Sequence, residues 1–165
     1  MSDWTSTASV LIAAGGLAYT GSQFQLLTRD RKKERKLGIE GVCVSWFPEH
    51  NPRRDEVLSD GTAVWKYVFS VYNPGQFPIS QVEVDIHFAM DVRRVRGQHL
   101  DDASHTLRLR QPVIAGGATR PWNRYLRIDY AAASRLRETI AAVTFIDSEG
   151  KHHENTWPKQ LAGRD

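Results

Sequence analysis

Cysteine is nearly absent from this chain, because Cys43 is the only thiol among 165 residues. One cysteine excludes an internal disulfide framework and favours a reducing compartment, although secreted proteins without disulfides exist. We expect Cys43 to be a small buried core residue. The sequence also lacks an HExxH motif and any CxxC pair, the spacings of common zinc sites. Gly116-Gly117 does not have the spacing of a nucleotide-binding fingerprint and is predicted to lie in a turn.

Charge of one sign is also scarce, because the formal net charge is only +3. The basic residues are concentrated in RDRKKERK at residues 29–36, and the rest of the chain has 16 basic and 17 acidic side chains. The high isoelectric point is therefore a local property and does not by itself indicate a nucleic-acid partner. We call this stretch the basic flank, and its cationic side chains are Arg29, Arg31, Lys32, Lys33, Arg35 and Lys36.

Residues 4–28 contain no charged side chain. As an α-helix with a rise of about 1.5 Å per residue, this segment is long enough to cross a hydrocarbon layer of about 30 Å. Polar residues dilute its second half, which counts against a membrane span, whereas its three glycines lower helix propensity in water but are common in membrane helices. A secretory signal peptide fits less well, because no positive charge precedes the apolar part. The predicted membrane-anchor residues are Val10, Leu11, Ile12 and Leu17.

Two interpretations of this segment stay open. In the first, it is a single-span anchor, and the basic flank keeps the carboxy-terminal side in the cytoplasm by the positive-inside rule. In the second, it is an amphipathic helix that packs on the following domain or on copies of itself. In both, charge pairs three and four residues apart support a helix that runs to Lys36, and Gly38 is expected to end it.

The region after Gly38 is organised around residues 79–92, ISQVEVDIHFAMDV. Apolar side chains occupy every second position, and mostly polar or charged side chains lie between them. A period of two places the two sets on opposite faces of an extended strand, which predicts the central strand of a half-buried antiparallel sheet. The apolar set is Val82, Val84, Ile86, Phe88, Met90 and Val92.

Short apolar or alternating runs separated by turn signals continue along the chain. Asp60-Gly61 is typical of a hairpin turn, and Asn73-Pro74-Gly75 has the residues that a type II turn prefers. About seven strands without long intervening helices predict a β-sandwich, with Trp65 expected at its centre. The predicted strands cover residues 39–47, 63–72, 79–92, 106–110, 122–128, 140–146 and 151–157, with loops at 47–55 and 93–104 and a short helical crossing at 131–138.

The order of three stretches, VYNPGQFPISQVEVDI, VIAGGATRPW and AAVTFIDSEGKHHENTW, resembles that of immunoglobulin-like domains. More narrowly, the chain is similar to small bacterial membrane-anchored proteins in which a hydrophobic helix and an Arg-rich stalk precede one such domain. The resemblance implies a mainly β fold, an immunoglobulin-like antiparallel β-sandwich of about seven strands with an N-terminal α-helix. It implies membrane attachment but no catalytic residues. The chain departs from antibody-type domains because it has no cysteine pair between the sheets.

Two groups of polar side chains are candidates for chemistry, and we favour a structural explanation for each. His152, His153 and Glu154 alternate on a predicted strand, so His153 faces away from the other two and the three cannot bind one ion. Asp85 and His87 share the outward face of the central strand, but no nucleophile or oxyanion hole accompanies them. We expect neither a metal site nor catalytic residues.

Arginines form the remaining candidate group. Arg93, Arg94 and Arg96 follow the central strand, and other arginines alternate along the later strands. With Trp122 and Tyr125 nearby, such a face is suited to a phosphate backbone or single-stranded nucleic acid. We favour a charged exterior that protects edge strands. The arginines of the later strands are Arg108, Arg110, Arg120, Arg124 and Arg127.

We therefore predict two domains: a hydrophobic helix with its basic juxtamembrane flank at residues 1–37, and the β-sandwich at residues 38–165. The predicted function is a non-enzymatic interaction or scaffold module without a cofactor, anchored at the inner membrane, with its sandwich facing the cytoplasm and binding an unidentified protein. One alternative is a soluble, cytoplasmic subunit of a larger assembly, packed through the helix as a homo-oligomer. The other is a nucleic-acid-binding domain.

Overall fold

The computed structural model describes residues 29–158 and divides the chain into two units, Met1–Leu37 and Gly38–Asp165, which are treated separately. Within residues 29–158, no helix combines the length and the apolar composition that crossing a membrane requires. The anchor interpretation stays a prediction, because its residues lie outside the described part of the chain: Val10, Leu11, Ile12 and Leu17.

A helix covers residues 29–40 and contains the whole basic flank, most of which is exposed. The sequence predicted that Gly38 would end this helix, but the helix continues for two further residues. Glycine lowers helix propensity by about 1 kcal/mol and does not forbid a helix. Gly38 instead permits a close approach, since a Cβ built on it would lie 2.9 Å from the Cα of Gly75.

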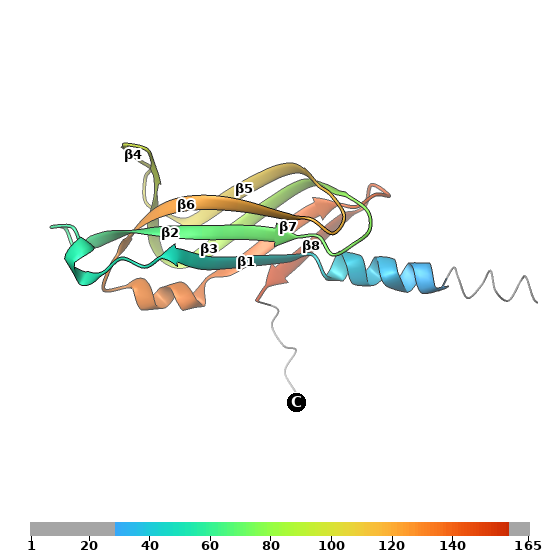
Figure 1. The fold of residues 1–165 in the computed structure, drawn as a ribbon, viewed down its shortest axis with the longest axis horizontal. Helices are drawn as coiled ribbons and strands as arrows, with labels where there is room; N and C mark the ends of the chain where they lie inside the picture. The colour runs from blue at the N-terminus through green and yellow to red at the C-terminus, as the bar shows by residue number, and fades with distance from the viewer. Residues whose placement is uncertain (1–28, 159–165) are drawn as a thin grey trace, which may run out of the picture. The chain divides into compact units, whose positions relative to one another are not determined.

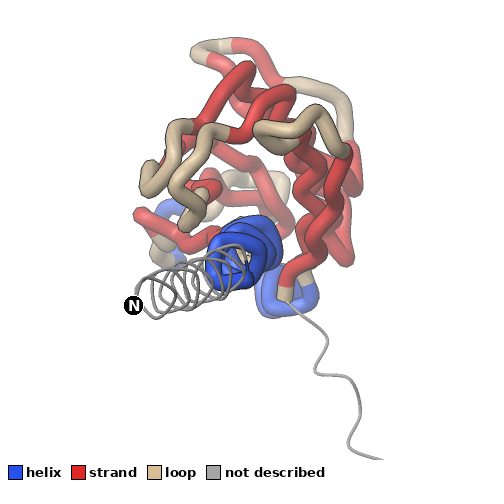
Figure 2. Tube along the Cα trace, turned by 90° about the vertical axis from the view of Figure 1, so that its right-hand side faces the viewer, coloured by secondary structure: helices blue, strands red, loops and turns tan. Residues whose placement is uncertain are grey.

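Residues 38–158 form a mainly β fold, in which eight strands build one antiparallel sheet curled into a half-barrel (Figure 1, Figure 2). The prediction of an antiparallel β fold is confirmed. The strands are β1 (Cys43–His50), β2 (Thr62–Tyr72), β3 (Ile79–Arg96), β4 (His99–Leu100), β5 (Ser104–Ile114), β6 (Thr119–Asp129), β7 (Ile140–Ile146) and β8 (His152–Trp157). Two 3-10 helices, η1 (Arg54–Glu56) and η2 (Ala133–Glu138), lie between strands, and η2 matches the predicted short crossing.

The 18-residue strand β3 connects the two walls of the half-barrel. β5 pairs along one of its edges. On the other edge, β7 pairs with β3 as far as His87, and β6 takes over from Val92. The first wall is therefore β1-β2-β6, and the second contains β5, the first half of β3, β7 and β8. The register with β5 is irregular between His87 and Val92, where β3 passes from one wall to the other.

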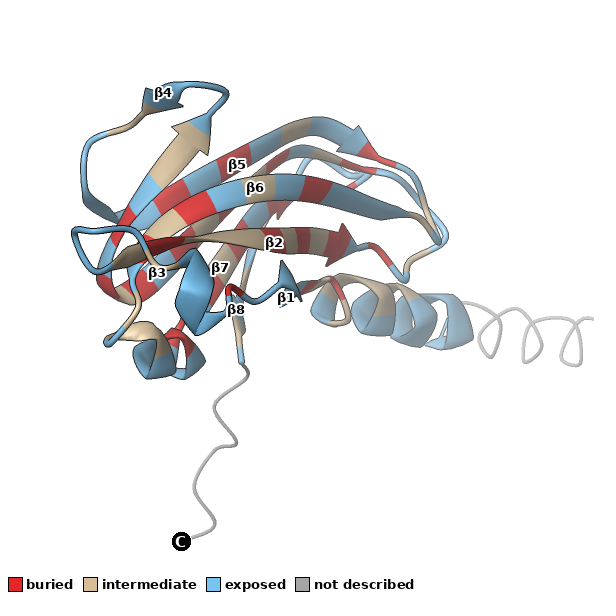
Figure 3. Cartoon of the chain, turned by 60° about the vertical axis from the view of Figure 1, so that its left-hand side comes forward, coloured by how far each residue is buried: buried red, intermediate tan, exposed pale blue. Residues whose placement is uncertain are grey.

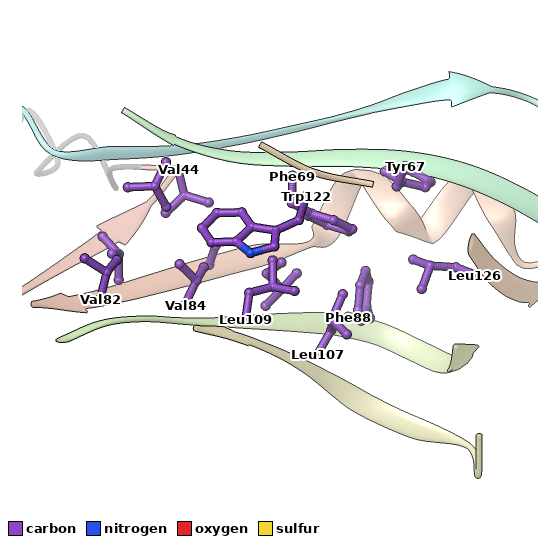
Figure 4. Packing of buried hydrophobic residues seen from close by; sticks show 14 of the residues in the cluster. Val44, Tyr67, Phe69, Val82, Val84, Phe88, Leu107, Leu109, Trp122 and Leu126 are labelled. Atoms are coloured by element: carbon purple, nitrogen blue, oxygen red, sulfur yellow. The ribbon is translucent and has the colours of Figure 1, made fainter. Parts of the chain in front are cut away.

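The hydrophobic core lies between these walls (Figure 4). All six apolar side chains that the sequence placed on one face of the central strand are buried, with at most 6% exposure. The same alternation of buried and exposed positions is visible along β5 and β6 in Figure 3. Full burial of such a side chain stabilises the fold by about 1.5–3 kcal/mol, so this pattern fixes which side of β3 faces inward.

Trp65 is not the central side chain that the sequence predicted, because it is only partly buried at the margin of the core. Phe69 and Phe145 are at most 1% exposed, and Trp122 is 7% exposed. Phe69 pairs directly with Trp122 in the middle of β2, whereas Trp65 lies near the start of that strand. The position of a residue along its strand therefore decides which aromatic ring is central, and this position relative to the core cannot be read from the residue type.

Cys43 is also placed differently from the prediction. Its neighbours Val42 and Val44 are 0% and 5% exposed, while Cys43 lies on the opposite, partly exposed face of β1. Alternation required the valines and the cysteine to be on opposite faces. The two valines occupy the core because together they bury more apolar surface than one thiol.

Several strands extend into stretches predicted as loops. β1 begins at Cys43 and runs to His50, and β3 continues to Arg96, where β4 pairs with it. Charged side chains made these stretches resemble loops. The backbone nevertheless stays extended because neighbouring strands supply hydrogen-bond partners, as at the pair Val95 and Tyr125.

Asn73 joins two turns at one end of the half-barrel. Its Oδ1 accepts a hydrogen bond from the Gly75 amide at 3.1 Å, and its Nδ2 donates to the carbonyls of Phe77 and Ala115 at 2.9 and 3.1 Å. The predicted type II turn is wrong, since that turn needs positive φ at Gly75 and this residue does not have it. A Cβ on Gly116 would overlap backbone atoms of the facing turn, so only glycine fits there.

Candidate interaction surfaces

The outward side of the first wall carries mostly apolar and hydroxyl side chains. Each of these apolar side chains is next in sequence to a residue that faces the core, so the alternation of a strand places it on the outward side of the sheet. Phe47 lies opposite Val68 on the neighbouring strand, and Phe47, Tyr72 and Tyr125 are 52%, 41% and 47% exposed. We call this surface the apolar face and define it by Phe47, Val64, Val68, Tyr72 and Tyr125.

Two ion pairs lie among the apolar side chains of this face. Lys66 Nζ lies 2.9 Å from a Glu49 carboxylate oxygen, and the hydrogen bond to that carboxylate raises the pKa of Lys66. Arg127 pairs with Asp60. The pKa of Asp60 is lowered, chiefly because the Thr62 hydroxyl and amide donate to its carboxylate at 2.7 and 3.1 Å. Lys66 lies between Val64 and Val68 on β2 and opposite Tyr125, so its ion pair crosses the apolar face, and Arg127 lies opposite Val64.

The outward side of the second wall is charged instead. Arg108 donates from Nε and Nη2 to the two carboxylate oxygens of Asp85, at 2.7 and 3.1 Å. Glu83 lies between Arg108 and Arg110: it accepts a hydrogen bond from Arg110 Nε at 2.9 Å and forms an ion pair with Arg108, whose Nε lies 2.9 Å from Glu83 Oε1. We call this set the charged face: Glu83, Asp85, Arg108 and Arg110. Its charges are neutralised within the surface itself.

The candidate acid–base pair belongs to this charged face. Asp85 and His87 share the outward side, as the sequence predicted. Both Asp85 oxygens, however, accept from Arg108, and the nearest hydrogen-bond partner of His87 is the Thr106 hydroxyl, 3.3 Å from Nδ1. The carboxylate and the imidazole are therefore each turned to a neighbour on β5, and the arrangement supports the sheet.

The histidines of β8 are separated as predicted. His153 pairs with Phe145 in the core-facing register, while His152 and Glu154 face outward. His153 Nε2 lies 2.9 Å from Asp147 Oδ2, and its ring stacks on Phe145 with centroids 5.4 Å apart. Among the described residues, no three His, Cys, Asp or Glu side chains are grouped to hold a metal ion.

A shallow depression of about 420 Å³ lies on the second wall beside an irregularity of β3. The irregularity is at Gln81, which has φ of +50° and is the extra residue where β3 shifts register against β7. Few non-glycine residues adopt this conformation. Polar side chains that line the depression include Glu83, Arg110, Thr144 and His152. Sequence reasoning missed this feature, because a glutamine within an alternating run carries no signal of a bulge.

The arginines that the sequence grouped are divided among several places, and Arg93 lies on the outward side opposite Arg127. Arg108 and Arg110 belong to the charged face, and Arg127 pairs with Asp60 beside the apolar face. The remaining arginines of β6 lie on the core-facing side with Arg94 and Arg96. Trp122, which the nucleic-acid interpretation needed as a stacking partner, is buried, so this part of that interpretation is wrong.

No known protein family and no curated protein matches this chain. A structural genomics target solved by X-ray crystallography is 12% identical, with a TM-score of 0.43 over 78% of this chain and 96% of that chain. A protein assigned as ApaA from Bordetella pertussis is 16% identical (TM-score 0.41, 70% and 86%), and a FixG-related protein from Vibrio parahaemolyticus is 17% identical (TM-score 0.33, 70% and 91%). These likenesses are too weak to support an argument about fold or function.

Proposed function

We propose that this protein is a non-catalytic interaction module whose β domain binds a protein partner through the apolar face. The observation that carries the proposal is the difference between the two outward surfaces. The charged face satisfies its own charges, whereas the apolar face leaves three aromatic rings about half exposed. Aromatic side chains supply much of the binding energy at protein interfaces.

Site-specific photo-crosslinking in cells tests this surface. Phe47→p-benzoylphenylalanine places the probe on the apolar face, and the same replacement of His87 places it on the charged face as a matched control. We expect a discrete adduct from position 47 and none from position 87. Tyr125→Arg, elsewhere on the apolar face, should abolish the adduct while the thermal midpoint changes little. Equal adducts from both positions, or none from position 47, would contradict the proposal.

We propose further that the amino-terminal segment holds this module at the inner membrane, with the β domain on the cytoplasmic side. The support comes from the sequence: residues 4–28 lack charge, and the basic flank follows them. This flank lies on a helix whose basic side chains are mostly exposed, and therefore available to anionic lipid or to solvent.

Fractionation of the full chain tests the anchor. We expect the protein in the membrane fraction after salt and carbonate washes, and the double variant Leu11→Arg with Ile12→Arg in the soluble fraction, because each central arginine disfavours insertion by about 2.5–3.5 kcal/mol. Leu58→Arg, at a residue 44% exposed on the β domain, is the control and should not redistribute. A wild-type protein that stays soluble as a defined oligomer would contradict the anchor and favour a subunit packed through its helix.

We also infer that the half-barrel is a variant of the immunoglobulin-like sandwich. Two walls of antiparallel strands enclosing one core support this inference. The departure is β3, which pairs in both walls and thereby joins them along one side. An experimental structure in which the strands close into a complete barrel would contradict it.

A further inference from the structure

Four arginines lie together on the core-facing side of the sheet, two on β3 and two on β6. Arg94 and Arg96 continue the inward register of Val92, and Arg120 and Arg124 continue that of Trp122. β3 and β6 pair with Arg94 opposite Leu126, so the next inward position carries Arg96 to the level of Arg124. We call this group the arginine cluster.

The members of the cluster influence one another electrostatically. Burial lowers the pKa of Arg124, and the positive charges of Arg94, Arg96 and Arg120 lower it further. Burial also lowers the pKa of Arg94, with a further contribution from Arg96 and an opposing one from Asp101. The four guanidinium groups are therefore close enough to repel, even though they come from separate strands.

The cluster has too few acidic partners for its charge. Arg96 Nε lies 3.1 Å from Asp101 Oδ2, but among residues 29–158 no carboxylate lies within 4.0 Å of Arg94, Arg120 or Arg124. Arg124 donates from Nη1 to the Asn123 carbonyl at 2.8 Å, while its buried Nε has no hydrogen-bond partner. A buried donor without an acceptor costs about 1–3 kcal/mol.

Most other arginines of the same sheet are neutralised; the exception is Arg93, which is exposed and faces outward opposite Arg127. Arg108, Arg110 and Arg127 each have a carboxylate partner at hydrogen-bonding distance. In the cluster, repulsion between like charges coincides with a buried donor that has no acceptor. Unfavourable electrostatics of this kind are relieved when an anion binds, and such sites are concentrated where proteins bind ligands.

We propose that the arginine cluster is a binding site for an anion with two or more linked phosphate groups. Each guanidinium presents parallel donors that match phosphate oxygens, and three uncompensated arginines require more negative charge than one carboxylate supplies. Arg120 and Arg124 are four residues apart on a strand, about 13 Å, so the cluster spans more than a single phosphate. Arg96 and Arg120 are exposed, which leaves the cluster accessible to an anion from solution.

A nucleic-acid strand fits these residues less well than a small polyanion. Recognition of single strands depends on stacking of bases on aromatic rings beside the basic residues. Trp122 is buried beneath Arg120, whose guanidinium carbon lies 6.0 Å from the ring centroid. Tyr125 has the opposite register on β6 and belongs to the apolar face. The cluster therefore offers charge without an exposed stacking surface.

Calorimetric titration of the full chain with tripolyphosphate, at fixed ionic strength in neutral detergent, tests the site. Arg94→Gln and Arg120→Gln should each weaken binding about tenfold, as expected for one lost charge-assisted hydrogen bond. Arg110→Gln removes the same charge from the charged face and should leave the dissociation constant within about twofold, since it is distant and already neutralised. Without ligand, Arg94→Gln should raise the melting temperature, because one repelling charge is gone.

Free polyphosphates and phosphorylated lipid headgroups offer the same chemistry, so a second arm separates them. The full chain is floated with neutral vesicles and with vesicles that contain phosphatidic acid, and wild type is compared with the variant Arg94→Gln with Arg120→Gln. Loss of a phosphatidic-acid preference in this variant assigns the phosphate to a lipid; tripolyphosphate binding without such a preference assigns it to solution. The proposal is overturned if neither probe binds, if Arg110→Gln weakens binding as much, or if only a single-stranded oligonucleotide binds.

Discussion

Asn73→Asp replaces one side-chain nitrogen by oxygen where two turns of the half-barrel meet. Asn73 is 1% exposed, and its Nδ2 faces the carbonyl oxygens of Phe77, Ala115 and Ile114 at 2.9, 3.1 and 3.3 Å. Aspartate has nearly the same shape, so the change leaves packing intact. It removes the donors and directs a carboxylate oxygen at three carbonyl oxygens.

The magnitude follows from the donor count. An amide NH₂ group carries two hydrogens, so two full hydrogen bonds are lost even though three acceptors are close. Each buried acceptor left without its donor costs about 1–3 kcal/mol. We therefore expect Asn73→Asp to lower the free energy of unfolding by about 2–5 kcal/mol at neutral pH, a large part of the stability of an ordinary domain.

The loss should depend on pH in a defined direction. The buried site disfavours the carboxylate, so the folded-state pKa of the new aspartate lies above its unfolded value of about 3.9. The folded variant then binds the proton more tightly than the unfolded chain does. Its stability relative to wild type should therefore be highest below about pH 4 and fall as the pH rises through the folded-state pKa. The protonated form also restores one donor.

Urea unfolding followed by tryptophan fluorescence at pH 4 and pH 7.5 measures both quantities. Asn123→Asp makes the same chemical change at an exposed position of β6 and is the matched control. We expect it to change the free energy of unfolding by less than about 0.5 kcal/mol. If Asn73→Asp cost no more than this control, or lost stability on acidification, the role assigned to the Asn73 amide would be wrong.

Three further outcomes are expected. In urea unfolding, Gly116→Ala should destabilise the domain by about 2–4 kcal/mol, because the added Cβ overlaps backbone atoms. Gly150→Ala has open space around it but φ of +79°, and it should cost about 1–2 kcal/mol. Equal losses would contradict the close approach of the turns. Ile86→Ala, at a fully buried position, should cost about 2–5 kcal/mol, and a loss below about 1 kcal/mol would place β3 outside the core. Thr62→Val should raise the pKa of Asp60 toward its ordinary 3.8 in a carbon-detected NMR titration, and an unchanged pKa would show that the hydroxyl is not the main cause of the shift. A lowered carboxyl pKa gives stability that is present at neutral pH and lost on acidification, so the variant should also lose less stability than wild type below pH 4.

Much of the fold was predictable because alternation is a local property. The central strand was recognised from six apolar side chains, and all six are buried. The strand β7 was predicted with the same bounds, Ile140–Ile146, because a short, nearly continuous apolar run is typical of a strand. Strand ends were less predictable. The charged stretch after Val92 stays extended only because β4 and β6 pair with it.

The candidate surfaces were predictable only in part. The sequence placed Asp85 and His87 on one face and separated His153 from its neighbours, and both statements are confirmed. It did not show that Arg108, on another strand, would form a hydrogen-bonded ion pair with Asp85. It also treated the arginines as one group, although pairing partners divide them among neutralised and uncompensated places. The apolar face was missed, though Tyr72 and Tyr125 lie at alternating positions that predict exposure.

By itself, the sequence determined which side chains share a face of each strand, because that depends only on the geometry of consecutive residues. It also determined that one helix precedes a β domain, through the change of period after Gly38. The tertiary structure decided which face became the core at Cys43, which aromatic ring became central, and how Arg96 and Arg124 came together. These outcomes depend on strand register and on the passage of β3 between two walls, which are set by the total apolar surface that the pairing buries and not by any local stretch.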